Sequence, residues 1–204
     1  MKQLFLEKSV GIVKDSYPQY NYDTLSEIKY GLEAFYLTIT KTIVILTIAA
    51  LLHLLIETLF LCICFNILRF SGFGIHASKS WMCWVSSSII FIFIPYLCSI
   101  IILPSEVLLI TALLCEINFL LFAPADTKKH PLINRRKRVK WKIWTVISGL
   151  VFMCFILISQ NVLIQNTLLS AMLIESAMIN PVVYRIFHLP YNNYKSYVYS
   201  TEKE

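Results

Sequence analysis

Apolar residues gather in long stretches along this chain, and most charged residues lie between the stretches or near the ends. The stretches cover residues 40–68, 81–103, 107–125, 143–159 and 162–187. Each approaches or exceeds the ~20 residues that an α-helix needs to cross the hydrocarbon core of a bilayer. The pattern therefore predicts an all-α fold, a polytopic integral membrane helical bundle.

The first stretch is long enough to hold either one helix or two. Residues 40–69 can form one tilted span, but His53 and Glu57 near the middle also permit two short helices joined by a polar turn. Two helices keep the N-terminal lysines on the same side as the other basic segments, whereas one helix separates them. We therefore favour six transmembrane helices with both termini in the cytoplasm. The outer turns are then expected near residues 53–57, 104–106 and 159–161.

The N-terminal segment, residues 1–38, mixes lysines with acidic residues and lacks a continuous apolar core, so it is not a cleavable signal peptide. Thr24 and Glu27 have the spacing of a capping box, which predicts an amphipathic interfacial helical segment. Its role is either packing against the first span or docking a substrate. The expected organisation is an amphipathic segment at 1–38, a transmembrane bundle at 39–188 with a catalytic loop at 69–84 and a basic cytoplasmic loop at 126–142, and a cytoplasmic tail at 189–204.

The composition agrees with a membrane protein. Hydrophobic residues make up 57% of the 204 residues and the mean hydropathy is +0.68, more than a soluble domain of this size can bury in one core. Five of the six cysteines lie within apolar stretches, which argues against a disulfide framework. Cys62 and Cys64 lack the spacing of a metal or redox motif. We predict no metal and no cofactor.

Cys83 is the one cysteine that stands at the edge of an apolar stretch beside polar residues. A continuous helix would hold it about 10 Å from His76 at ~1.5 Å per residue, too far for proton transfer. Gly72, Gly74 and the polar residues after His76 predict a loop instead. With Ser80 as the N-cap, Cys83 would lie in the first helical turn, where unpaired N–H groups and the positive helix end favour a thiolate. Cys83 is the candidate nucleophile and His76 its general base.

Basic residues between the third and fourth stretches account for much of the net charge of +6. They either fix the topology beside anionic membrane lipid or, in addition, bind an acidic partner segment by charge pairing. No nucleic-acid-binding motif accompanies them, so we do not expect nucleic acid as a partner. The candidate binding residues are Lys128, Lys129, Arg135, Arg136, Lys137 and Arg138.

Two acidic residues lie inside apolar stretches. Glu116 and Glu175 must be neutral or paired within the bundle, because hydrocarbon does not solvate a carboxylate. They indicate either a proton or substrate path, or carboxyl groups that hydrogen-bond to a neighbouring helix or a second copy. Asn180 and Pro181 predict a helix kink.

The order of these features resembles the accessory gene regulator B (AgrB) family over nearly the whole chain. The residues that carry the resemblance are Arg69, the Gly74-x-His76-Ala77 motif, Cys83 at the start of a span, and Phe122-Ala-Pro124-Ala-Asp126-Thr-Lys128-Lys129-x-Pro131 before the basic run. Members of that family are bacterial membrane cysteine endopeptidases that process a quorum-sensing pheromone precursor. Their histidine and cysteine correspond to His76 and Cys83.

The resemblance implies an AgrD-like peptide precursor as substrate and the bacterial cell membrane as location, with the catalytic loop in the cytoplasm. Cys83 would expel the C-terminal tail and form a thioester, which a substrate thiol or hydroxyl would displace to close a thiolactone or lactone. It also implies a homodimer, and an acidic tail for Arg69 and the basic residues to bind. Asp126 either orients His76 or balances nearby lysines. The alternative is a non-enzymatic small membrane transporter or receptor-like protein.

Overall fold

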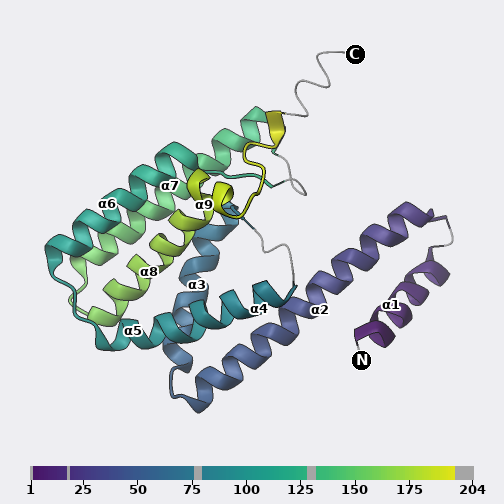
Figure 1. The fold of residues 1–204 in the computed structure, drawn as a ribbon, viewed down its shortest axis with the longest axis horizontal. Coiled ribbons are helices and arrows are strands. Elements are labelled where there is room, and N and C mark those ends of the chain that lie inside the picture. Colours follow the sequence, from purple (N-terminus) through teal and green to yellow (C-terminus); the bar gives the residue numbers. More distant parts are fainter. Residues whose placement is uncertain (1, 18, 76–79, 128–131, 196–204) are drawn as a thin grey trace. The chain divides into compact units, whose positions relative to one another are not determined.

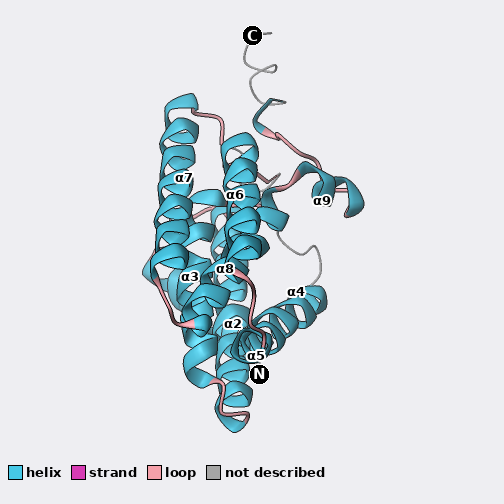
Figure 2. Cartoon of the chain, turned by 90° about the vertical axis from the view of Figure 1, so that its left-hand side faces the viewer, coloured by secondary structure: helices cyan, strands magenta, loops and turns pink. Residues whose placement is uncertain are grey.

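A computed structural model describes residues 2–17, 19–75, 80–127 and 132–195. Its named elements in these ranges are all helical (Figure 2). Six of the helical segments are long and apolar enough to cross a membrane, which confirms the predicted all-α, polytopic class. Their bounds are Thr24–Leu51, Leu55–Gly72, Trp81–Ile100, Ser105–Phe122, Arg135–Ile158 and Val162–Ile179. The first apolar stretch is therefore divided, at residues 52–54.

The chain forms two compact units that divide between Leu51 and Leu52. The first unit contains α1 (Lys2–Ser16) and α2 (Tyr22–Leu51), which contact each other. Leu6 is buried in this unit, and the rings of Phe5 and Tyr36 lie 5.3 Å apart. The hairpin is thus held by a few apolar contacts.

Helix α2 begins before the predicted capping box. The side chain of Asn21 accepts a hydrogen bond from the backbone N–H of Thr24 at 2.9 Å, so Asn21 caps the helix and the Thr24 hydroxyl donates to the same oxygen. The helix then runs through residues 38 and 39 without a break, because no proline interrupts it. The expected boundary at residue 38 falls inside this helix.

The second unit is built on four helices, α3 (Leu55–Gly72), α6 (Ser105–Phe122), α7 (Arg135–Ile158) and α8 (Val162–Ile179). Helix α8 contacts the other three and is the most deeply buried of the spans (Figure 1). The core between them is apolar and includes Leu61, Phe119, Ile156 and Met172. Close packing rather than a hydrophobic driving force holds such helices together in lipid.

The third span combines α4 (Ser80–Ser88), a π-helical segment η1 (Ile89–Phe93) and α5 (Ile94–Ile100). Pro95 has no N–H to offer the carbonyl of Phe91, four residues earlier. The Thr58 hydroxyl of α3 donates to that carbonyl at 3.0 Å. At the C-terminal end of the third span, the Asn166 amide of α8 donates to the carbonyls of Cys98 and Ile101 at 3.0 and 2.6 Å. Polar side chains therefore satisfy backbone groups that lipid could not.

Helix α7 starts earlier than its apolar stretch. Asn134 accepts hydrogen bonds from the N–H groups of Arg136 and Lys137, which fixes the helix start at Arg135. Arginine and lysine are good helix formers, so the basic run continues the helix. The predicted loop at 126–142 is thus corrected: it is helical from Arg135 onward.

The last apolar stretch also differs from the prediction. Helix α8 ends at Ile179, and the short helix α9 (Pro181–Ile186) starts anew after Asn180, whose side chain accepts from the Val182 N–H at 2.9 Å. Pro181 takes the first helical position, where its missing N–H costs nothing. The sequence predicted a kink at this point, and the structure shows a full break.

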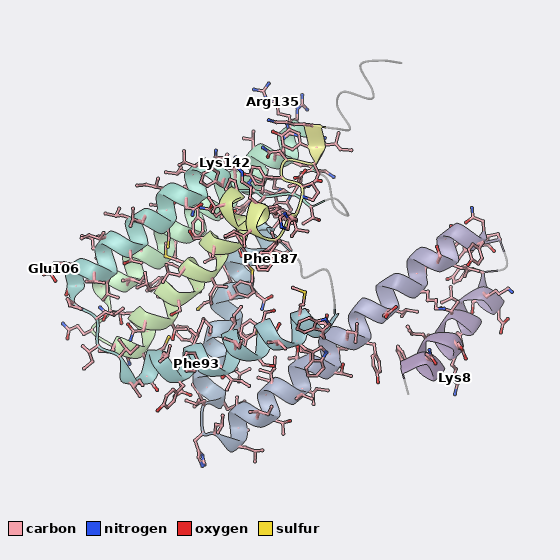
Figure 3. All side chains as sticks on the ribbon, viewed as in Figure 1. Lys8, Phe93, Glu106, Arg135, Lys142 and Phe187 are labelled. Carbon is pink, nitrogen blue, oxygen red and sulfur yellow. The ribbon has the colours of Figure 1, made fainter. Side chains whose placement is uncertain are left out.

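Charge separates the two ends of the second unit. Glu106 lies at one end, where α6 begins, and Arg135 and Lys142 lie toward the opposite end of the unit (Figure 3). The turns at the Glu106 end span residues 101–104 and 159–161. They lie within a few residues of the outer turns that were predicted near 104–106 and 159–161.

Candidate functional site

Cys83 is the fourth residue of α4 and lies in the first turn of that helix. Its side chain is half-buried, and the Ser86 hydroxyl donates to its carbonyl oxygen at 3.2 Å. His76 lies outside the described residues, as do Ala77, Ser78 and Lys79. The thiol lies in the first helical turn as expected, although Ser80 is the first residue of the helix and not its N-cap. The pairing of His76 with Cys83 stays a prediction.

The backbone that leads to His76 is tightly held. Phe73 and Gly74 both have positive φ, +61° and +89°, which turns the chain away from the end of α3. The Gly74 N–H donates to the carbonyl of Ala125 at 2.8 Å, and the Ile75 N–H donates to the carbonyl of Met178 at 3.0 Å. Only glycine fits at 74, because a Cβ there would lie 2.6 Å from the Met178 carbonyl oxygen. The residue before His76 is therefore anchored to α8.

A buried ion pair supports this turn from inside the bundle. Arg69 Nη1 and Glu175 Oε2 are 3.7 Å apart, and the Glu175 side chain is 0% exposed. The other guanidinium nitrogen of Arg69 donates to the carbonyl of Ile75 at 2.5 Å and to that of Gly74 at 3.3 Å. Glu175 in α8 is thus linked through Arg69 in α3 to the two residues that precede His76.

Gly72 makes room for this pair. A Cβ at position 72 would overlap the Oε1 atom of Glu175. Gly72 and Gly74 were both predicted to shape a loop. Gly74 lies in the turn, but Gly72 is the last residue of α3 and is needed there for its lack of a side chain. Arg69 was also proposed to bind substrate; its guanidinium is mostly buried and faces Glu175 and two carbonyls.

Asp126 lies beside the same turn, in the segment that follows α6. Its Oδ1 accepts from the Asn193 N–H at 2.8 Å and its Oδ2 from the Tyr194 N–H at 2.7 Å. The sequence offered two roles for it, orienting His76 or balancing lysines. The described contacts give a third role, because the buried carboxylate holds the C-terminal segment against the 123–126 segment.

Two tyrosines complete the packing around Asp126. The Tyr184 hydroxyl donates to the Asp126 carbonyl at 3.1 Å, and the rings of Tyr184 and Tyr191 meet edge to face at 5.1 Å. Burial raises the pKa of Tyr191 to about 12 and raises the pKa of Tyr184 as well. Both phenols therefore stay neutral hydrogen-bond donors at physiological pH.

The predicted basic residues divide into two groups. Arg138 donates to the carbonyls of Leu132 and Ile133 at 2.7 and 2.9 Å, and its guanidinium lies 3.8 Å over the ring of Tyr194. It therefore shapes the segment before α7. Arg135, Arg136 and Lys137 are exposed on the first turn of α7, and Lys128 and Lys129 lie outside the described residues.

Sequence reasoning missed how the site is supported. It treated Glu175 as an intramembrane acid of unknown partner, although Arg69 at the end of another span was the natural counter-charge. It could not find Ala125 or Met178, since both contribute backbone carbonyls and no distinctive side chain. The tie between Asp126 and residues 193–194 is a contact across 67 residues that spacing does not reveal.

Glu116 is the second buried carboxyl of the bundle. It lies in α6 against Gly149 of α7, where an added Cβ would overlap its Oε2 atom. Its side-chain oxygens have no hydrogen-bond partner in the part of the chain that the structure describes. The oxygens of Glu175 also lack a hydrogen bond there, so the two carboxyls differ in that Glu175 has the guanidinium of Arg69 at 3.7 Å.

These features define a multi-pass membrane protein with a cysteine at a helix start and, eight or nine residues earlier in the chain, a braced glycine turn. The chain belongs to the accessory gene regulator B family, whose sequence profile matches residues 7–179. A putative AgrB-like protein of Clostridium acetobutylicum is 28% identical over 170 residues, which cover 83% of this chain and 81% of the relative. One from Listeria innocua is 30% identical over 171 residues, 84% of each chain.

A third relative carries a more specific name. The accessory gene regulator protein B of Staphylococcus carnosus is 29% identical over 141 residues, which cover 68% of this chain and 74% of the relative. No solved structure matches the chain. The comparisons thus confirm the family, and they leave the roles of individual residues to be proposed.

Proposed function

We propose that this protein is a membrane cysteine endopeptidase that removes the C-terminal tail of a peptide pheromone precursor and promotes its cyclisation. Membership of the accessory gene regulator B family supports a role in quorum sensing. The observation that carries the proposal is the placement of Cys83 in the first turn of α4, eight residues along the chain from Ile75, whose backbone N–H is bonded to the carbonyl of Met178.

Cys83 acts as the nucleophile in this proposal. His76 takes the thiol proton, and the sulfur attacks a peptide carbonyl carbon of the precursor. A C–S bond forms, the C–N bond breaks, and the departing amine of the tail takes the proton from His76. The precursor is left as a thioester on Cys83. Backbone N–H groups at the start of α4 are suitable donors for the oxyanion that develops.

The thioester is released by the substrate itself. A thiol or hydroxyl of the precursor attacks the acyl carbon, closes a thiolactone or lactone ring, and returns the sulfur of Cys83 with its proton. Exchange of one thioester for another is close to thermoneutral, so exclusion of water and correct orientation decide between cyclisation and hydrolysis. A half-buried thiol at the end of a membrane bundle suits both requirements.

The exposed basic turn of α7 supplies the second part of the proposal. Arg135, Arg136 and Lys137 form an exposed cationic patch at the start of α7, and Trp141 of the same helix meets the ring of Phe73, the residue before Gly74. Such a patch suits an acidic tail by charge complementarity. Together with Lys128 and Lys129 it is the proposed tail-binding surface, and the positive-inside rule supports a cytoplasmic position for the catalytic loop.

Intact-mass analysis of the protein in lipid vesicles with the precursor encoded beside its gene tests the reaction. We expect an adduct equal to the precursor without its tail, sensitive to hydroxylamine, in the native protein. Cys83→Ala and His76→Ala should both lack it. Cys154→Ala, which removes an exposed cysteine of α7, is the matched control and should keep it.

The mass of the released peptide separates cyclisation from hydrolysis, because the ring is one water lighter than the linear product. A full yield of adduct in Cys83→Ala would overturn the assignment of the nucleophile. Absence of both adduct and tail release in the native protein, with a folded sample, would favour the non-enzymatic transporter or receptor-like alternative.

A further inference from the structure

A groove runs along the outer face between α3 and α7, and neither the ion pair nor Cys83 belongs to it. Its volume is about 780 Å³, and it is lined by residues 62–71 of α3 and 140–148 of α7. The walls are mainly apolar, and Ile63 and Ile67 leave 59% and 46% of their surface uncovered. In a spanning helix pair such a face meets lipid.

Polar groups gather at one end of the groove. Lys140 is exposed at the end where Phe70 and Trp141 meet, and Ser148 lies about 12 Å further along α7 at ~1.5 Å per residue. A second recess of about 440 Å³, which includes Arg136, shares Lys140 and Trp144 with the groove. The head end is therefore cationic and aromatic, and the remainder is mainly apolar, with Asn66 and Ser148 as polar lining residues.

Asn66 lines the groove away from Lys140, and its side-chain amide donates within its own helix. The Asn66 amide donates to the carbonyl of Cys62 at 2.7 Å. The walls therefore favour an apolar chain over a polar peptide backbone, which would need hydrogen-bond partners of its own. A molecule with a negative head and a long apolar tail matches this arrangement.

We propose that the groove between α3 and α7 binds one acyl chain of an anionic phospholipid, with the lipid phosphate held by Lys140 and Arg136. Each cation near a membrane surface contributes about five-fold in affinity for anionic lipid. The indole of Trp144, which is 53% exposed, lies where the head and the chain of the lipid join.

The lipid would touch the wall that supports the glycine turn. Trp141 lines the groove, and its ring meets those of Phe70 and Phe73 edge to face at 5.2 and 5.6 Å. Phe73 directly precedes Gly74. Occupancy of the groove would thus stabilise the aromatic contacts behind the turn, whichever reaction the protein performs.

Fluorescence quenching by brominated lipid tests the site without any activity measurement. The full chain is reconstituted in phosphatidylcholine vesicles that contain a minor fraction of brominated phosphatidylglycerol or, for comparison, brominated phosphatidylcholine. We expect brominated phosphatidylglycerol to quench tryptophan emission more strongly than brominated phosphatidylcholine does. Trp144→Phe should remove most of this difference in quenching.

Charge variants test whether the stronger quenching by the anionic lipid comes from the groove. Lys140→Glu should lower the preference for phosphatidylglycerol about five-fold or more, because a cation is replaced by an anion. Arg185→Glu makes the same charge change at an exposed residue of α9 that does not line the groove, and it should keep the preference. Both substitutions are at exposed positions, so the fold should survive.

Three results would overturn the proposal. Equal quenching by the two brominated lipids would mean that the groove does not select an anionic head. A preference that Lys140→Glu and Arg185→Glu lower equally would reflect general enrichment of anionic lipid around a basic protein. Full displacement of the brominated lipid by an added precursor peptide at Trp144 would assign the groove to the peptide instead.

Discussion

Glu175 and Glu116 are both carboxyls buried in the same helical bundle, but only Glu175 has a counter-charge among the described residues. Glu175 faces Arg69, which in turn binds the carbonyls of Gly74 and Ile75. Glu116 faces Gly149, and the described residues offer it neither an ion pair nor a hydrogen bond, whereas Glu175 lacks only the hydrogen bond. The difference shows that an acidic residue in a span is not a functional signal in itself. What it contacts decides whether it supports a site.

The largest expected effect comes from breaking the Arg69–Glu175 pair. Arg69→Met should destabilise the protein by about 3–5 kcal/mol, because it leaves Glu175 buried without its counter-charge. Product formation should also be lost, since the carbonyls before His76 lose their donor. Thermal unfolding in detergent and the intact-mass assay measure the two effects, with Arg185→Met at an exposed site as the control.

The double variant Arg69→Met with Glu175→Leu separates stability from positioning. Replacing both members of a buried pair by apolar residues is often neutral for stability, so the unfolding temperature should recover. Processing should not recover, because neither new side chain can donate to Gly74 or Ile75. Recovery of both stability and processing would contradict a positioning role for Arg69.

A pair of glycine substitutions compares the two carboxyls directly. Gly72→Ala and Gly149→Ala each place a methyl group on a glutamate oxygen, that of Glu175 or that of Glu116. Overpacking of this kind costs about 1–3 kcal/mol, so both variants should lower the unfolding temperature. Only Gly72→Ala should reduce turnover per folded molecule, because it displaces Glu175 from Arg69. Equal turnover in the two variants would remove the distinction between the carboxyls.

The same contrast explains what the sequence could predict. Hydropathy and charge identified the spans because length and composition alone determine them in lipid, and His53 and Glu57 marked where the first stretch divides. Helix ends were predicted less well. The starts of α2, α7 and α9 are fixed by caps at Asn21, Asn134 and Asn180. A hydropathy pattern does not reveal such a start, because a cap depends on one side-chain oxygen.

The candidate site was predictable only in its chemical groups. The glycines and Cys83 stood out by residue type and spacing. The partners that brace the turn did not, because Ala125 and Met178 act through backbone carbonyls and Glu175 acts from a helix more than 100 residues away along the chain. Tertiary packing creates these contacts, and a single sequence carries no direct record of them.

Asp126 offers a third carboxyl, outside the spans, with two backbone donors from the C-terminal segment. Asp126→Asn should cost about 1–2 kcal/mol, because the two charge-assisted hydrogen bonds to Asn193 and Tyr194 become one neutral bond at most. Limited proteolysis should then cut the C-terminal segment sooner than in the native protein. Unchanged proteolysis, with a control cleavage at another site holding constant, would mean that Tyr184 and the ring contacts hold this segment without Asp126.

The smallest effect is expected at Glu116. Glu116→Gln keeps the size and polarity of the uncharged acid, and the described structure shows no donor or cation that would be lost. The free energy of unfolding should therefore change by less than about 1 kcal/mol, and processing should remain near the native level.

The measurement is the same pair of assays, thermal unfolding and intact mass, with Glu175→Gln as the matched change in α8. Glutamine at 175 removes the counter-charge of Arg69 and should lower both stability and processing. If glutamine at 116 instead abolished processing in a stable protein, the unpartnered carboxyl would be part of the chemistry, and the contrast between the two acids would have to be reversed.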